Sequence, residues 1–195
     1  MPVTGDMSEN PDGTKNYSMT AVKEDDGNTV TASAFVAGYR DKPDPMKLNA
    51  PQYSVAGGAI DVSNPYGHSL GLNATYTPPV GTQVTTSTNL NLVHNETHRM
   101  DVNAFATAHI PKAGPNFMTH GAGASYMFKE RAGLNASVSQ TPYFKQTDYG
   151  LGGSLNVHRT PNSSFDVNIG ANRTVTPFHN SNWNKSIGFG YKRTF

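Results

Sequence analysis

The sequence predicts an all-β protein, built as a single antiparallel up-and-down meander of about 10–12 strands that is curled or closed into a β-barrel. Three observations support this fold class: the composition, the regular spacing of turns, and the alternation of apolar and polar residues between them. The 195 residues include 19 glycines and many Asn, Ser and Thr residues, whereas only 35% are hydrophobic. This balance favours strands and turns over helices.

Turns recur at regular intervals along the chain. Loops that carry proline lie about 33 residues apart, and a second set of turns lies between them. A turn therefore follows about every 16 residues, a spacing that is typical of a β-meander. The proline loops contain Pro45, Pro78, Pro111, Pro142 and Pro177, and the other turns lie at 26–28, 64–67, 94–97, 129–131 and 161–163.

The segments between the turns are the expected strands. Glycine, asparagine, threonine and proline interrupt each segment too often for a helix. We therefore expect eleven strands, at 15–22, 29–38, 52–62, 68–77, 83–93, 98–109, 118–128, 132–141, 148–158, 164–175 and 185–194.

Apolar and small polar residues alternate within these strands, which gives the sheet two different faces. The apolar face includes Leu70, Leu72, Leu90, Leu92, Leu134, Val138, Leu151, Leu155, Val167, Ile169, Ile187 and Phe189. The polar face includes Asn73, Asn91, Asn103, Asn135, Ser154, Asn168, Asn172 and Gly188.

The polar face carries few charged residues, Asp101 and Asp166 among them. Solvent-exposed strands usually carry more charge than this. Two arrangements fit the pattern. In a soluble barrel the apolar face packs a core, and in a membrane barrel that face meets lipid while the small polar face lines the lumen. The periodicity does not choose between them.

Composition and charge restrict the function. A net charge of +1 is too small to indicate nucleic acid as the main partner. The absence of cysteine removes any disulfide framework and any thiolate metal site. No window of the sequence is apolar enough for a transmembrane helix. The start of the chain lacks the features of a secretory signal, so a secreted protein would be present here in its mature form, with an initiator methionine added for expression.

We expect neither enzymatic activity nor a bound cofactor or metal. The common nucleophile, zinc-protease and phosphate-loop motifs are missing, and the scattered carboxylates suggest no acid–base pair. Seven histidines are present, and His94 and His98 lie across one turn. Without clustered carboxylates or cysteines, this pattern favours exposed histidines over a zinc site.

Basic residues lie at the chain reversals. Each can bind a lipid phosphate, with about 1 kcal/mol per charge near an anionic surface, although solubilising charge is the ordinary role of any single one. One end of the meander carries Arg99, Lys129, Arg131 and Arg159, and the other carries Arg40, Lys42, Lys47, Lys112, Lys145 and Lys185.

Aromatic residues gather at the proline-loop end. Trp183 lies there with Tyr143, Phe144 and Phe178, where such side chains anchor at a membrane interface or cap the end of a barrel. The candidate membrane-binding residues are therefore Arg99, Lys129, Arg131, Arg159 and Trp183.

Nine blocks of the sequence, together with Trp183 and the aromatic last strand, form a recognisable series. The blocks are 93–98, 103–107, 116–117, 121–123, 126–133, 148–153, 155–157, 160–166 and 176–178. In this order they resemble the insect attacins, a family of glycine-rich antibacterial proteins. The resemblance is clearest over residues 50–195, which correspond to the glycine-rich attacin domains and are expected to form one continuous β-barrel with the amino-terminal strands. Residues 1–49 correspond to the attacin amino-terminal segment.

The resemblance implies a secreted antibacterial effector of insect innate immunity, present in the haemolymph. It implies binding and permeabilisation of the Gram-negative outer membrane through lipopolysaccharide, so that the five candidate residues above become candidate lipopolysaccharide ligands. The implied partners are the bacterial outer membrane and lipopolysaccharide, with no nucleic acid and no obligate protein partner. The family offers no catalytic residues to carry over.

Three other classes of function fit the same pattern. An integral outer-membrane-type β-barrel pore would need detergent to stay in solution. A soluble lipid-carrying barrel would co-purify with its ligand. A chain that is largely disordered in water would form strands only on a membrane.

Overall fold

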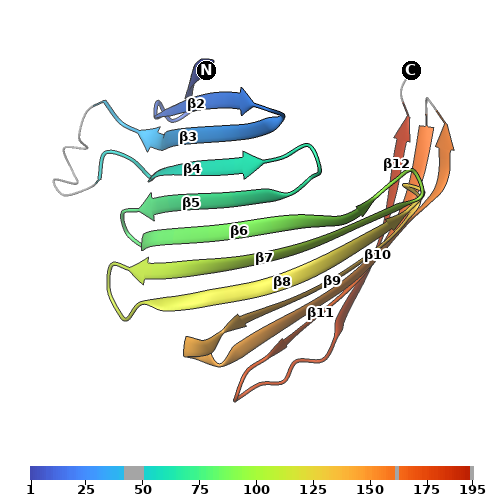
Figure 1. Ribbon diagram of the computed structural model, residues 1–195. Coiled ribbons are helices and arrows are strands. Elements are labelled where there is room, and N and C mark those ends of the chain that lie inside the picture. The colour runs from blue at the N-terminus through green and yellow to red at the C-terminus, as the bar shows by residue number, and fades with distance from the viewer. Residues whose placement is uncertain (42–50, 161–162, 194–195) are drawn as a thin grey trace. The chain divides into compact units, whose positions relative to one another are not determined.

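Twelve antiparallel strands form one sheet, and their order in the sheet is their order in the sequence (Figure 1). The computed structural model describes residues 1–41, 51–160 and 163–193, apart from the side chain of Arg159. The strands are β1 Val3–Glu9, β2 Lys15–Asp25, β3 Asn28–Tyr39, β4 Val55–Ser63, β5 Ser69–Thr77, β6 Gly81–His94, β7 His98–Pro111, β8 Phe117–Phe128, β9 Ala132–Thr141, β10 Gln146–Thr160, β11 Ser163–Val175 and β12 Asn184–Arg193.

The sheet is a meander without crossovers, which confirms the predicted fold class. Its first and last members, β1 and β12, are edge strands, so the described sheet is open rather than closed. The eleven strands expected from the turn spacing correspond to β2 through β12. The strand that was not expected is β1 at Val3–Glu9, which pairs with β2.

The connections follow the predicted turns. The loop between β9 and β10 contains one turn of 3₁₀ helix, η1, at Pro142–Phe144. The β8–β9 hairpin turns at Lys129 and Glu130, both of which have positive φ. Of the sequence predictions, those on Lys42, Pro45, Lys47 and the turn residues 161–162 lie outside the described residues.

A short turn joins β1 to β2. The carboxylate Oδ1 of Asp12 accepts hydrogen bonds from the hydroxyl of Thr14 at 2.7 Å and from its backbone N–H at 3.1 Å. These bonds hold the pKa of Asp12 below its usual value, because they favour the charged carboxylate.

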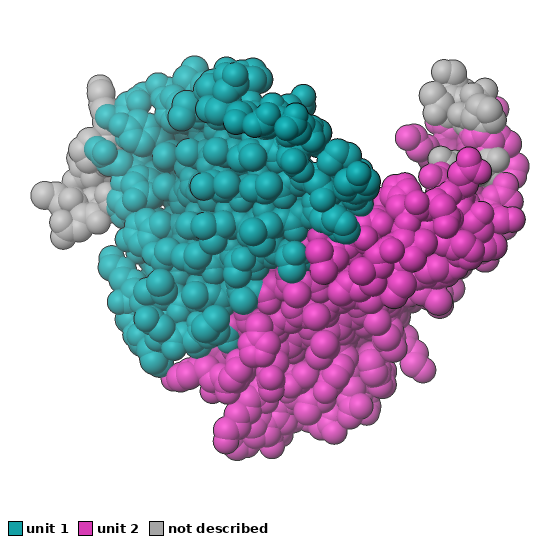
Figure 2. Space-filling model, viewed as in Figure 1, with its two compact units in different colours: residues 1–88, 106–118 teal, residues 89–105, 119–195 magenta. Residues whose placement is uncertain are grey.

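The chain divides into two compact units (Figure 2). One comprises residues 1–88 and 106–118, and the other comprises residues 89–105 and 119–195. In both units the sheet is a single layer of backbone. Among the described residues, no hydrophobic side chain is buried. The buried polar side chains are Thr14, Asn91, Asp101 and Thr141.

Candidate functional site

The strand registers separate two faces, as the alternation in the sequence predicts. Between β9 and β10, Val138 lies opposite Tyr149 and Ala136 lies opposite Leu151. One residue further along, Ser137 lies opposite Gly150. Because neighbouring residues of a strand point to opposite sides, the large apolar side chains share one face and the small polar ones share the other.

The apolar face continues to the last strand. Between β11 and β12, Ile169 lies opposite Ile187 and Val167 lies opposite Phe189. These residues are neighbours on one face of the sheet, and several of their side chains are largely exposed. Leu134 is 65% exposed, Ile187 is 65% exposed and Phe189 is 67% exposed. The same face is exposed in the other unit, where Leu70 is 57% exposed and Leu72 is 49% exposed.

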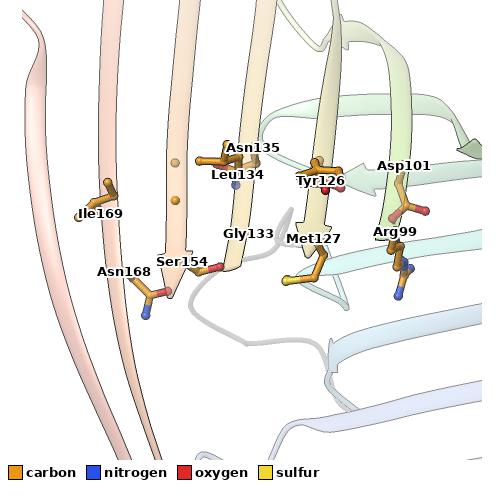
Figure 3. A pocket seen from close by; sticks show the side chains of 13 residues that line it. Arg99, Asp101, Tyr126, Met127, Gly133, Leu134, Asn135, Ser154, Asn168 and Ile169 are labelled. Atoms are coloured by element: carbon orange, nitrogen blue, oxygen red, sulfur yellow. Dashed lines mark hydrogen bonds and ion pairs between the residues drawn. The ribbon is translucent and has the colours of Figure 1, made fainter. Parts of the chain in front are cut away.

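The polar face is lined by small residues that fit closely together. Asn135 of β9 lies opposite Gly152 of β10, and a Cβ atom added to Gly152 would lie 2.1 Å from the Asn135 side-chain oxygen. Asn135, Ser154 and Asn168 border a hollow of about 460 Å³, which also reaches Arg99 and Asp101 (Figure 3). Glycine on one strand therefore makes room for asparagine on the next.

The few carboxylates of the polar face have hydrogen-bond partners within the sheet. Asp101 accepts from the Asn91 amide at 3.0 Å and from Arg99 Nε at 2.9 Å. Asp166 accepts from the Asn156 amide at 2.6 Å. These bonds stabilise partly buried charges that would otherwise be costly.

Asp148 follows the same pattern near the opposite ends of the strands. Its carboxylate accepts from the hydroxyl of Thr174 at 2.6 Å and from the amide of Gln146 at 2.8 Å. The three partnered carboxylates suit structural roles, because each is held by neighbouring side chains of the sheet.

Two of the predicted basic residues lie in the β8–β9 turn. The Nζ atom of Lys129 lies 5.4 Å from the centroid of the Phe128 ring, a cation–π distance. The turn is bound to both neighbouring segments, since the Lys129 N–H donates to the Thr97 carbonyl and the Arg131 carbonyl accepts from the Asn156 N–H. Lys129 and Arg131 are exposed at the end of a firmly held hairpin.

Arg99 lies near the same end of the sheet, close to the start of β7. Its side chain is 57% exposed, but its Nε atom is engaged by Asp101. Arg159 lies near the end of β10 opposite Ser164, and its side chain lies outside the described part of the chain. The four basic residues are thus at hairpin ends of the same unit, and Arg99 is paired with the carboxylate of Asp101.

Trp183 lies just before β12, on the apolar side of the sheet. It is 37% exposed and borders an apolar hollow together with Val138, Tyr149 and Leu151. The sequence placed Trp183 at the end of the strands, but it did not indicate that the ring lies beside these apolar residues. The ring lies there because the loop before β12 folds back onto the sheet. In that loop Ser181 N–H donates to the Thr174 carbonyl.

The two histidines considered for zinc have other neighbours. His98 Nδ1 lies 2.6 Å from the Tyr126 hydroxyl, and the two rings are stacked. His94 Nδ1 lies 3.5 Å from the Asn91 amide. Within residues 1–41, 51–160 and 163–193, no three potential ligands among His, Asp and Glu gather closely enough to hold a metal ion.

Sequence reasoning missed two phenylalanines on the polar face. A Cβ atom added to Gly57 would lie 2.8 Å from the Phe35 ring, and one added to Gly121 would lie 2.7 Å from the Phe105 ring. In each unit a phenylalanine therefore covers a glycine of the next strand. The shared sequence Ala-Phe at 34–35 and 104–105 is the signal that could have revealed this repeat.

Strand order and the two faces together define the class of protein by its fold, an all-β up-and-down antiparallel meander. The fold is similar to that of an anion-selective porin from Comamonas acidovorans, with a TM-score of 0.57 and 10% sequence identity. The match covers 90% of this chain and 54% of the porin chain, so this chain spans about half the length of the porin. In the described residues, no helix is long and apolar enough to cross a membrane.

The sequence then identifies the family. The family model described as Attacin, C-terminal region matches residues 78–195. Similar proteins are defense protein 3 of Lonomia obliqua, 38% identical, and attacin-E of Hyalophora cecropia, 37% identical, each match covering 98% of this chain and 79% of the relative. Attacin of Bombyx mori is 36% identical over 98% of this chain and 87% of its own length.

The chain belongs to the attacin family, whose members are antibacterial defence proteins. This confirms the resemblance found in the sequence blocks. The division of the chain at residues 49 and 50 stays a prediction, as does the assignment of the five candidate binding residues.

Proposed function

We propose that this protein is a secreted, extracellular, non-enzymatic effector that binds and permeabilises the outer membrane of Gram-negative bacteria. One observation carries the proposal: the sheet has a continuous apolar face, and no hydrophobic side chain of the described residues is buried. Monomeric soluble proteins rarely expose apolar patches larger than a few hundred Å². Lipid acyl chains would cover such a face. Along each strand, residues that face the hydrocarbon would alternate with small polar residues that face the other side of the sheet.

Lipopolysaccharide is the proposed first contact. Its phosphates are anionic, and Lys129 and Arg131 present exposed cations on a hairpin that backbone hydrogen bonds hold in place. Arg159 and Arg99 would add to this cationic end of the strands. Arg99 would contribute least, because Asp101 already engages its guanidinium group.

The binding step is tested with one triple variant and a matched control. We expect Lys129→Gln, Arg131→Gln and Arg159→Gln together to weaken binding to vesicles that contain lipopolysaccharide, and the effect to shrink as salt screens the charges. The control replaces Arg40, Lys112 and Lys145 by Gln, which removes the same charge from the proline-loop end. Equal binding by both triple variants would show that the cationic hairpin end has no special role.

The lipid step is tested by circular dichroism and by the fluorescence of Trp183, the single tryptophan of the chain. We expect the emission of Trp183 to shift to shorter wavelength on lipopolysaccharide-containing vesicles, because its ring leaves water together with Leu151 and Tyr149. Far-UV circular dichroism in buffer and on the vesicles separates a prefolded sheet from folding on the membrane. Unchanged tryptophan emission, with no release of an entrapped dye, would contradict the proposal.

A further inference from the structure

Each edge strand of the sheet has one partner strand in the described residues. β1 pairs with β2, and β12 pairs with β11. On the other side of each strand, alternate residues present backbone N–H and C=O groups along the seven residues of β1 and the ten residues of β12. In β1 the Met7 N–H donates to the Asp6 carboxylate at 2.9 Å, a bond that a pairing strand would replace. Such an edge is a template for another strand.

The two edges carry opposite charge. The charged residues of β1 are both acidic, Asp6 and Glu9. Those of β12 are all basic, Lys185, Lys192 and Arg193. Edges of this kind attract each other, whereas two β1 edges or two β12 edges would repel.

The residue patterns of the two edges also match. β1 runs toward the β1–β2 turn, and β12 runs away from the β11–β12 loop, so an antiparallel pair places the start of one beside the end of the other. The register that puts Glu9 opposite Lys185 also puts Met7 opposite Ile187. The remaining residues of β1 and β12 pair in the same register. Every apolar-face position then meets another apolar-face position, and a one-residue slip would break this match.

Two further pairs in this register are favourable. Gly5 would lie opposite Phe189, so the aromatic ring would cover the glycine, as Phe105 covers Gly121 inside the sheet. On the polar face, Asp6 would lie opposite Gly188, where a Cβ atom would meet nothing within 4 Å. The glycines of β12 therefore leave room for the carboxylate of β1.

We infer that β12 of one copy pairs antiparallel with β1 of a second copy, and that two such junctions join two copies into one closed sheet. The opposite charges and the matching faces of the two edges favour a second copy as the occupant, and the porin match fits this, because one chain covers 54% of the porin chain and leaves the rest of that chain unmatched. Two copies contribute 24 strands, an even number within the range of roughly 8–26 found in bacterial outer-membrane barrels. A two-fold rotation makes the two β12–β1 junctions identical, so the closed sheet has no edge strand left.

This inference rests on the proposed function, because lipid around the apolar face is where the closed sheet would be stable. The chain has no cysteine, so engineered cysteines report without background. Met7→Cys and Ile187→Cys are made as separate single variants, mixed in equal amounts and oxidised in buffer and on phosphatidylethanolamine–phosphatidylglycerol vesicles that contain lipopolysaccharide. Antiparallel neighbours have Cα atoms about 4.5–5.5 Å apart, within reach of a disulfide.

We expect the mixture to give a disulfide-linked dimer of one variant with the other on vesicles. In the matched control, Met7→Cys is mixed with Leu134→Cys instead of Ile187→Cys. Leu134 is 65% exposed, as Ile187 is, but it lies on the interior strand β9. This control should not form the mixed dimer. Dye release and vesicle binding are measured in the same samples, so loss of membrane action is seen separately from loss of pairing.

A charge exchange tests the register. Glu9→Lys and Lys185→Glu are each expected to lower the yield of the mixed dimer roughly fivefold or more, and a chain carrying both changes should restore it. Lys112→Glu, a change of the same charge away from the edges, should leave the yield unaltered. Restoration by the double exchange is a result that a general loss of folding would not produce.

Two outcomes would overturn the inference. The first is vesicle binding and dye release without any mixed dimer in buffer or on vesicles, which would leave the proposed function standing. The second is a disulfide within one chain that carries both Met7→Cys and Ile187→Cys, with no mixed dimer from the single variants. That result would mean that β1 and β12 of the same chain pair with each other.

Discussion

Single glycines limit what the turns of this sheet tolerate. Gly81, at the start of β6, has a φ of +128°, and a Cβ atom there would lie 2.2 Å from the Ile110 carbonyl oxygen. Gly114 also has a positive φ, +101°, but a Cβ atom there would meet nothing within 4 Å. The two positions therefore share a conformational restriction and differ in the space around them.

We expect Gly114→Ala to lower the free energy of unfolding by about 1 kcal/mol, the cost of a left-handed conformation for alanine. Gly81→Ala should lower it by a further 1–3 kcal/mol or so, because backbone atoms of the next loop must move. Urea denaturation of the folded protein, followed by far-UV circular dichroism, measures both. Equal losses would mean that the close approach at Gly81 is relieved without cost.

The side chains of the candidate site were predictable in identity but not in pairing. The positions of Arg99, Lys129 and Arg131 at one end of the strands follow from turn spacing alone. The bond from Arg99 to Asp101 and the placement of Lys129 over Phe128 depend on rotamers, which the alternation does not determine. Phe105 departs from the alternation altogether, because it fills the space above Gly121.

The β8–β9 hairpin has an unfavourable turn sequence. Its central residues, Lys129 and Glu130, have φ of 49° and 53°, the left-handed conformation of a type I′ turn that favours Asn-Gly or Asp-Gly. The β2–β3 hairpin uses the favoured Asp26-Gly27 with the same signs of φ. The charged residues of the β8–β9 turn are therefore less favourable for the turn conformation than Asn-Gly or Asp-Gly would be.

We expect Glu130→Gly to raise the free energy of unfolding by about 0.5–1 kcal/mol, because glycine adopts this φ without strain. The same denaturation experiment measures the change. Glu96→Gly, in the exposed β6–β7 turn where φ is not positive, serves as the comparison and should be neutral or slightly destabilising. A loss of stability in Glu130→Gly would mean that the interactions of the glutamate side chain outweigh the strain of its positive φ.

Strands β2 to β12 were predictable because turns and alternation agree over each of them. The strand β1 was not, since it offers Val3 and Met7 as its large apolar residues and contains Gly5 and Asp6 between them. Seven residues with two apolar positions give a weak period of two. The strand register in the structure shows that β1 pairs with β2 and forms the edge of the sheet.

Whether the apolar face packs a protein core or meets lipid depends on the whole molecule, and the periodicity of the sequence could not predict it. A soluble barrel and a membrane barrel have the same alternation, and they differ in whether apolar side chains pack against one another across an interior. In the described chain no such packing buries a hydrophobic side chain. This observation, which needs all strands in place, is what favours lipid.

One pair of substitutions compares the two faces. We expect Leu151→Lys, on the apolar face of β10, to weaken insertion into lipopolysaccharide-containing vesicles by about 2–4 kcal/mol, because a lysine would face hydrocarbon. Ser137→Lys, on the polar face of the adjacent β9, should change insertion little. Vesicle flotation and dye release measure both variants, and a larger effect from Ser137→Lys would reverse the assignment of the faces.

Each of the strands β2 to β11 pairs with the strand before it and the strand after it in the sequence, and the edge strands β1 and β12 each pair with one sequence neighbour. Each hydrogen-bonded ladder therefore needs the closure of one loop between sequence neighbours, which is short everywhere except between β3 and β4. Such closures have a small entropic cost and allow the sheet to grow from either end of the chain. A hairpin can form as soon as its two strands have left the ribosome or a translocation channel, without waiting for distant segments. The same architecture permits the gain or loss of a whole hairpin between relatives, because removing two adjacent strands leaves the remaining ladders with partners of their own.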